Sequence, residues 1–173
     1  LAPFKERVSL HLSNFKNFSK VLFDLNIRGV QGILLDLGLS SVVIDQAEYG
    51  FSYRNNGPLD MQFDRKGKFS AKDYLNNVSE SDLFITLKKF GEEPNARKIA
   101  KEIVQCVNQN KMQTTFDLRN AICNVVPERL QVKALARVFQ AIRIKINDEI
   151  KVLKRTMELA IEFLNLGGRL VII

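Results

Sequence analysis

One stretch of ten residues limits the fold more than any other part of the chain. In Gly32–Ser41 (GILLDLGLSS), an uninterrupted apolar run leads into Asp36, and a loop of small residues follows. An apolar run of strand length that is closed by Gly and Ser is typical of a buried parallel strand between two layers of helices. The carboxylate then falls at the carboxyl end of the strand, where open α/β sheets bind ligands. Taken alone, a solvated Asp that caps a turn explains this stretch equally well.

The segments at both ends of the chain predict an α/β fold with parallel pairing. Arg7–Leu12 alternates apolar and polar residues, as a short half-buried strand does. Residues 15–25 carry apolar side chains at helical spacing, so a βαβ unit is expected. Later, Asn147–Glu149 opens a second helix, which Gly167-Gly168 is expected to end. We expect the apolar segment 169–173 to return as a strand beside the first buried one.

Several short helices without a strand between them are predicted in the middle of the chain. Ser70 and Ser79 are N-cap candidates, and apolar residues at i, i+3 and i+4 spacing follow. A run of helices does not fit a βαβ alternation, so we expect an all-helical insertion. The expected organisation is a first part of the α/β domain at 1–69, the insertion at 70–136 and a second part of the α/β domain at 137–173.

A long loop separates the buried strand from these helices. Gly50–Asp64 lacks periodicity but contains several aromatic and apolar side chains, which argues against disorder. Loops of this length inside a compact domain are usually functional or disordered. Arg54, Asp60 and Asp64 could bind a ligand, or they could pair with one another and hold the shape of the loop.

The positive charge is concentrated in one part of the chain. The formal net charge is +7, and residues 97–155 hold 13 basic and 5 acidic side chains, whereas residues 1–96 hold 12 of each. Such a surplus favours a polyanionic partner, because each phosphate contact releases counterions. A solvated helical surface rich in Lys is the simpler alternative. No apolar run approaches the roughly 20 residues that a membrane span needs.

Metal chemistry and covalent catalysis find little support in the sequence. His11 is the only histidine, which argues against a histidine-based metal site or a catalytic triad. Cys106 and Cys123 lie within helical apolar patterns, as buried thiols of a reducing compartment do. Methyl transfer fits this composition, because a cofactor supplies the electrophile and the protein mainly positions the reactants.

Four blocks of sequence resemble one known family. They are Leu34–Ser41 (LLDLGLSS), Gly50–Asp64 (GFSYRNNGPLDMQFD), Phe90–Ala100 (FGEEPNARKIA) and Phe139–Glu149 (FQAIRIKINDE). In order and spacing, these blocks are similar to those of the RsmH/MraW family, S-adenosylmethionine-dependent small-subunit ribosomal RNA (cytosine-N4) methyltransferases. The resemblance implies a partial Rossmann-like methyltransferase domain with a parallel sheet and an inserted all-helical substrate-recognition domain. It also implies S-adenosyl-L-methionine as cofactor, and small-subunit ribosomal RNA or the ribosomal subunit as partner.

The resemblance further assigns residues to the cofactor and to catalysis. Asp36 matches the cofactor-contacting acid at the strand end, and Phe15 matches an aromatic residue beside the cofactor. Val43 stands where the family usually has a cofactor-contacting Gln, so no side-chain hydrogen bond is expected there. We expect the cytosine amino group to be held near Asp36, Ser40 and Ser41, without a strong base. Ordinary loop chemistry is the alternative role of the two serines.

Six basic residues are expected to bind ribosomal RNA, and they are Arg54, Arg97, Lys98, Lys101, Arg137 and Arg143. The family's glycine-rich cofactor loop would lie before Leu1 and its final strands after Ile173, so we expect a partial chain of a longer enzyme. The alternatives are a catalytically inactive RNA-binding relative and a fragment that acts in ribosome assembly. The expected location is the cytoplasm of a bacterium, or the mitochondrial matrix for an organellar homologue. A homodimer is compatible with this prediction, and neither a metal nor a membrane partner is expected.

Overall fold

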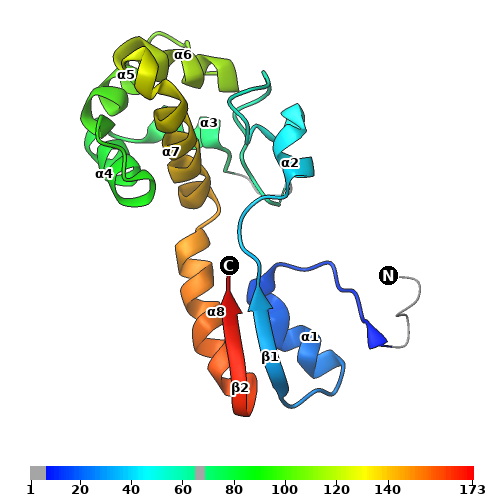
Figure 1. The fold of residues 1–173 in the computed structure, drawn as a ribbon. Helices are drawn as coiled ribbons and strands as arrows, with labels where there is room; N and C mark the ends of the chain where they lie inside the picture. The colour runs from blue at the N-terminus through cyan, green and yellow to red at the C-terminus, as the bar shows by residue number, and fades with distance from the viewer. Residues whose placement is uncertain (1–6, 65–68) are drawn as a thin grey trace. The chain divides into compact units, whose positions relative to one another are not determined.

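The computed structural model describes residues 7–64 and 69–173 of the chain. The described residues form two compact units, one made by the chain up to Gly38 together with Ile150–Ile173, the other by Leu39–Glu149. The fold is α/β, with a small parallel sheet. Its elements, shown in Figure 1, are η2 (Phe15–Asn17), α1 (Phe18–Asp24), β1 (Val30–Leu35), α2 (Ser41–Asp45), η3 (Ala47–Tyr49), α3 (Ala71–Asn77), α4 (Glu80–Gly91), α5 (Ala96–Asn108), α6 (Thr115–Val125), α7 (Glu128–Ile146), α8 (Glu149–Phe163) and β2 (Leu164–Ile172).

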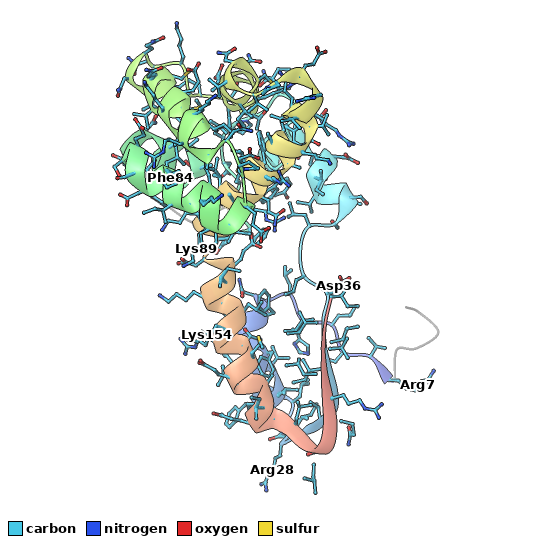
Figure 2. All side chains as sticks on the ribbon, turned by 60° about the vertical axis from the view of Figure 1, so that its left-hand side comes forward. Arg7, Arg28, Asp36, Phe84, Lys89 and Lys154 are labelled. Atoms are coloured by element: carbon cyan, nitrogen blue, oxygen red, sulfur yellow. The ribbon has the colours of Figure 1, made fainter. Side chains whose placement is uncertain are left out.

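The first unit is organised around the predicted strand, but the predicted burial is wrong for most of it, because only Leu35 of β1 is buried and Leu34 is 64% exposed. β2 returns parallel to β1, as expected, with Ile33 beside Leu170 and Leu35 beside Ile172. The ladder continues past the strand ends, because the N–H of Leu37 donates to the carbonyl of Ile173 at 2.9 Å. Asp36 therefore follows the carboxyl end of a paired strand, and Figure 2 shows it there.

Two further predictions about this unit are wrong. Residues 8–12 have no regular secondary structure, and the side chains of Leu10 and Leu12 are exposed. Alternation alone does not make a strand, since the backbone groups also need a paired neighbour, and no described strand pairs with this segment. In addition, α8 ends at Phe163, before the glycine pair. Those glycines instead lie where the pairing register shifts, and Gly167 adopts a φ of +81°.

The second unit holds the main hydrophobic core. The apolar stripe of α5 is buried as predicted, with Ile99 and Ile103 fully inaccessible to solvent. Each such side chain contributes about 1.5–3 kcal/mol through removal of apolar surface from water. α4 packs closely on α7 at Gly91, where an added Cβ would lie 2.7 Å from the carbonyl oxygen of Arg137.

Local capping explains where the helices of this unit begin. Ser70 and Asp73 form a reciprocal capping box at α3, Thr114 and Asp117 form another at α6, and Ser79 caps α4. The helix starts predicted at Ser70 and Ser79 are thus confirmed. The boundary expected after residue 136 falls inside α7, which is one continuous helix. An α/β domain interrupted by a helical insertion at 70–136 stays a prediction.

Candidate functional site

The long loop at residues 50–64 is built into the second unit rather than lying free on it. Its side chains Leu59 and Met61 are fully buried, and the N–H of Met61 donates to the carbonyl of Tyr49 at 2.9 Å. Asn147, which follows α7, holds the loop from the other side. Its amide Nδ2 donates to the carbonyl of Met61 at 2.8 Å, and its Oδ1 accepts from the N–H of Phe63 at 2.8 Å. The backbone of the loop is therefore fixed to the helices.

The tip of this loop is held by one buried hydroxyl. Thr115 Oγ1 donates to the carbonyl of Asn55 at 2.8 Å and accepts from the N–H of Gly57 at 3.0 Å. The N–H of Thr115 also donates to the carbonyl of Gly57 at 2.9 Å. Gly57 cannot be replaced without movement, because an added Cβ would overlap the carbonyl of Ala47. The first helical turn of α6 thus sets the position of Arg54 and its neighbours.

A pocket of about 460 Å³ lies between this loop, α2 and α7. Its polar wall is made by Ser41, Asp45, Tyr53, Arg54, Gln140 and Arg143. An aromatic pair borders it, since the rings of Tyr53 and Phe139 meet edge to face with centroids 5.7 Å apart. The volume falls in the range of roughly 300–1,000 Å³ that small-ligand sites occupy.

Unpaired polar groups face this pocket. The side chains of Asp45, Arg54 and Gln140 are exposed and make no hydrogen bond with any described residue. Arg143 is different, because Glu149 binds its guanidinium through two hydrogen bonds of 2.7 and 3.0 Å. The pocket therefore offers a ligand one carboxylate, one amide and one guanidinium that no described residue binds, next to one cation that Glu149 neutralises.

The structure separates the predicted cofactor residues between the two units. Asp36 and Phe15 belong to the first unit, where Asp36 is exposed and without a described partner and Phe15 is half-buried in η2. Val43 belongs to the second unit and packs against its hydrophobic core. Ser41 lines the pocket, whereas Ser40 is the N-cap of α2, where its Oγ accepts the N–H of Val43 at 3.4 Å.

The predicted RNA-binding residues do not form one cluster. Arg54 and Arg143 line the pocket, but Arg97, Lys98 and Lys101 are exposed on α5 and do not. The guanidinium of Arg97 lies 4.8 Å from the ring centroid of Phe84, which Figure 2 labels on α4. Arg137 lies 3.8 Å from Glu93, a carboxylate that is 1% exposed and otherwise leaves Oε2 without a hydrogen bond. Arg137 is thus held by a buried acid.

Three pocket residues were missed by sequence reasoning. Asp45 looked like an ordinary polar residue, and Tyr53 was considered only as part of an aromatic loop. Gln140 was detectable, because it stands three residues before Arg143 and therefore on the same helical face. Recognition of α7 as a single helix would have supplied that signal.

The described residues contain neither a cluster of metal ligands nor a helix that could span a membrane. In residues 7–64 and 69–173, no group of three or more His, Cys, Asp or Glu side chains could hold a metal ion. No helix within the same ranges is long and apolar enough to cross a membrane.

Comparison with known proteins places the chain in one family. The sequence model of the MraW methylase family matches residues 1–173. Three relatives named ribosomal RNA small subunit methyltransferase H illustrate the similarity. The protein of Ruminiclostridium cellulolyticum is 42% identical over 164 residues, which cover 93% of this chain and 52% of the relative. Those of Lachnospira eligens and Brevibacillus brevis are each 40% identical over 176 residues, with 100% of this chain and 56% of the relative covered. The chain spans about half the length of the curated relatives it matches.

Proposed function

Because the chain belongs to the MraW methylase family, we propose that it is part of a methyltransferase that modifies small-subunit ribosomal RNA. The main support for this proposal is that the family model matches the whole chain. In addition, relatives of about 40% identity are named ribosomal RNA small subunit methyltransferases. Our finer proposal is that S-adenosyl-L-methionine methylates the N4 atom of a cytidine in the decoding region. The four sequence blocks that resemble the cytosine-N4 methyltransferases support this choice.

The residues of the first unit fit a nucleoside cofactor. The Asp36 carboxylate is exposed at the carboxyl end of β1 and has no described partner, so it can accept hydrogen bonds from hydroxyl or amino groups. Gly38 follows with a φ of +116° and no atom near an added Cβ, which leaves the backbone beside the strand end open. Phe15 offers an aromatic ring in the same unit. We propose that Asp36 and Phe15 bind S-adenosylmethionine, while Val43 contributes only apolar contact.

The pocket of the second unit supports a role in holding the target nucleoside. Unpaired RNA bases are recognised by aromatic side chains and by hydrogen bonds to their edges. Tyr53 supplies an aromatic wall, and the free side chains of Asp45 and Gln140 supply an acceptor and an amide for a cytosine edge. Arg54 is available for an adjacent phosphate. A pyrimidine nucleoside therefore matches the chemistry that lines this pocket.

The proposed chemistry requires orientation more than a strong base. When bound, S-adenosylmethionine supplies an electrophilic methyl group. Asp36, Ser40 and Ser41 would accept a hydrogen bond from the cytosine amine and direct its lone pair toward that group. Ser40 already accepts one N–H as the cap of α2, so the free hydroxyl of Ser41 is the stronger candidate of the two serines. The amine loses its proton to such an acceptor or to water after transfer.

The basic residues complete the proposal. Arg54 and Arg143 lie at the pocket, while Arg97, Lys98, Lys101 and Arg137 extend over α5 and α7. We propose that residues 70–136 act as a substrate-recognition insertion within a Rossmann-like domain formed by 1–69 and 137–173. The exposed cations of α5 would then contact ribosomal RNA phosphates.

One experiment tests this function directly. The full-length protein is incubated with S-adenosylmethionine and small ribosomal subunits, and the RNA is digested and analysed by mass spectrometry. We expect one N4-methylated cytidine in the decoding region. Methylation of another atom or nucleotide would refute the finer proposal, and absence of methyl transfer despite cofactor binding would favour an inactive RNA-binding relative. Calorimetry with S-adenosylmethionine provides that cofactor control.

A further inference from the structure

The surface of α7 carries an unusual excess of positive charge. Among its residues are five basic side chains and a single acidic one, Glu128 in the first turn. The neighbouring helices are closer to balance, since α4 has two acidic and two basic residues and α5 has three basic and one acidic. An unbalanced helix surface attracts polyanions more strongly than a mixed one.

The cations in the first half of α7 share a face with the pocket. An α-helix turns about 100° per residue, so Arg129 and Lys133 lie within about 40° of each other and of Gln140 around the axis. Ala136 and Gln140 line the pocket from the second half of the same face. At about 1.5 Å rise per residue, Lys133 lies roughly 10 Å and Arg129 roughly 16 Å along the helix from Gln140.

Neither of these two cations has a partner among residues 7–64 and 69–173. Arg129 and Lys133 are exposed and make no ion pair or hydrogen bond with any described residue. Between them stands Val132, whose side chain is 68% exposed. Arg137, on the flank of the same helix, contrasts with them because the buried Glu93 carboxylate pairs with it. Of the three α7 cations without a described partner, Arg129 and Lys133 thus lie beyond the pocket toward the start of the helix, and Lys145 lies in its last turn.

We propose that Arg129, Val132 and Lys133 form a landing surface for the RNA strand that flanks the target nucleoside. This inference rests on the proposed function, because it extends the nucleoside pocket along one helix. The two cations would bind consecutive phosphates, and Val132 offers an apolar contact to a sugar or base between them. An acidic protein segment would also be attracted by the charges, but continuity with a nucleoside-sized pocket favours RNA.

The test measures how RNA binding depends on salt. The full-length protein and its Arg129→Gln/Lys133→Gln variant are titrated with a fluorescent single-stranded RNA of about ten nucleotides. The KCl concentration is varied between about 50 and about 300 mM, a range over which salt increasingly screens exposed charges. We expect about tenfold weaker binding for each lost charge-assisted contact. The slope of log K against log salt should become shallower by about 0.7 for each contact, or about 1.4 in all.

A matched control separates a defined surface from general charge. Lys88→Gln/Lys89→Gln removes two exposed cations from the last turn of α4 in the same unit, one of which, Lys89, lies 5.5 Å from the ring centroid of Phe90. We expect this variant to keep the parent slope and affinity. An unchanged slope in the α7 variant, or equal losses in both variants, would overturn the inference while leaving the proposed function standing. Failure of the parent protein to bind any RNA would overturn both.

Discussion

The guanidinium of Arg143 binds the carboxylate of Glu149 side by side, with Nε 2.7 Å from Oε1 and Nη2 3.0 Å from Oε2. The pair joins the last turn of α7 to the first residue of α8, where an acidic side chain also complements the helix dipole. Both side chains are about one-fifth exposed, so water screens the pair only in part. Arg143 therefore serves structure as well as the pocket.

Disruption of this pair should destabilise the fold. Glu149→Gln is expected to lower the free energy of unfolding by about 1–2 kcal/mol, because a carboxylate that accepts two hydrogen bonds is replaced by a neutral amide whose single oxygen accepts from the guanidinium. Arg143→Lys should lose a similar amount, since an ammonium cannot reproduce the planar fork. Urea denaturation of both single variants and of the double variant would measure the coupling. Strictly additive losses would contradict a direct interaction.

Removal of the Thr115 hydroxyl should loosen the loop that forms the pocket. Thr115→Val keeps the shape of the side chain but leaves the carbonyl of Asn55 and the N–H of Gly57 without this partner. We expect a loss of about 1–3 kcal/mol in the free energy of unfolding. Faster amide exchange at Asn55–Gly57 should accompany it. Thr115→Ser retains the hydroxyl and should show neither effect on loop exchange.

Asp36 should matter for the cofactor and not for stability. Asp36→Asn replaces an exposed carboxylate that has no described partner, so the free energy of unfolding should change by less than about 0.5 kcal/mol. The affinity of the full-length protein for S-adenosylmethionine should fall by roughly 10- to 100-fold, as expected for loss of a charged acceptor. Calorimetry measures this directly. Wild-type affinity in the variant would remove Asp36 from the cofactor site.

The lysines of α5 should affect RNA binding alone. Lys98→Glu/Lys101→Glu reverses two exposed charges, and we expect it to weaken binding to small-subunit ribosomal RNA by tenfold or more at low salt. S-adenosylmethionine affinity should stay the same. Filter binding and calorimetry on one preparation would compare the two readouts. Undiminished RNA affinity would place α5 outside the RNA interface.

The capping box of α3 should make folding stability depend on acid pH. Hydrogen bonds from the Ser70 hydroxyl and backbone N–H hold the pKa of Asp73 below its ordinary value of 3.8. The contribution is present above the unfolded-state pKa and is lost as the pH falls through the lower folded-state pKa. Asp73→Asn should therefore flatten the dependence of unfolding free energy on pH below about 3.8. Ser70→Ala should have a similar effect, and an unaltered pH profile in both variants would exclude this linkage.

The elements with local signals were predictable from sequence, and those that depend on distant pairing were not. Ser70 and Ser79 mark the starts of their helices in the sequence, because an N-cap acts within one helical turn. The β1–β2 pair was also foreseen from two apolar runs. The strand predicted at residues 8–12 is absent. Alternation of apolar and polar residues indicates one face of a strand, but it does not show whether a neighbouring strand is present for backbone hydrogen bonds.

The candidate site shows the same division. Ser41, Arg54 and Arg143 were expected at a ligand site, and they line one pocket. Asp45 and Gln140 carry no distinctive motif, because their proximity depends on how the loop at 50–64 docks on α6 and on the end of α7. That docking is made by Thr115 and Asn147, through bonds that span 58 to 86 residues of sequence. Local sequence patterns do not predict contacts between residues that lie so far apart in the sequence.

The continuity of α7 has a geometric consequence. Pocket residues such as Gln140 and cations such as Lys133 are spaced by the same rigid rod, so neither set can be displaced independently of the other. A single residue inserted between them would turn one half of the helix by about 100° relative to the other half. Insertions and deletions in this helix should therefore be tolerated far less well than substitutions on its surface. They change the angle about the helix axis between the pocket residues and the cations, whereas a surface substitution leaves that angle unchanged.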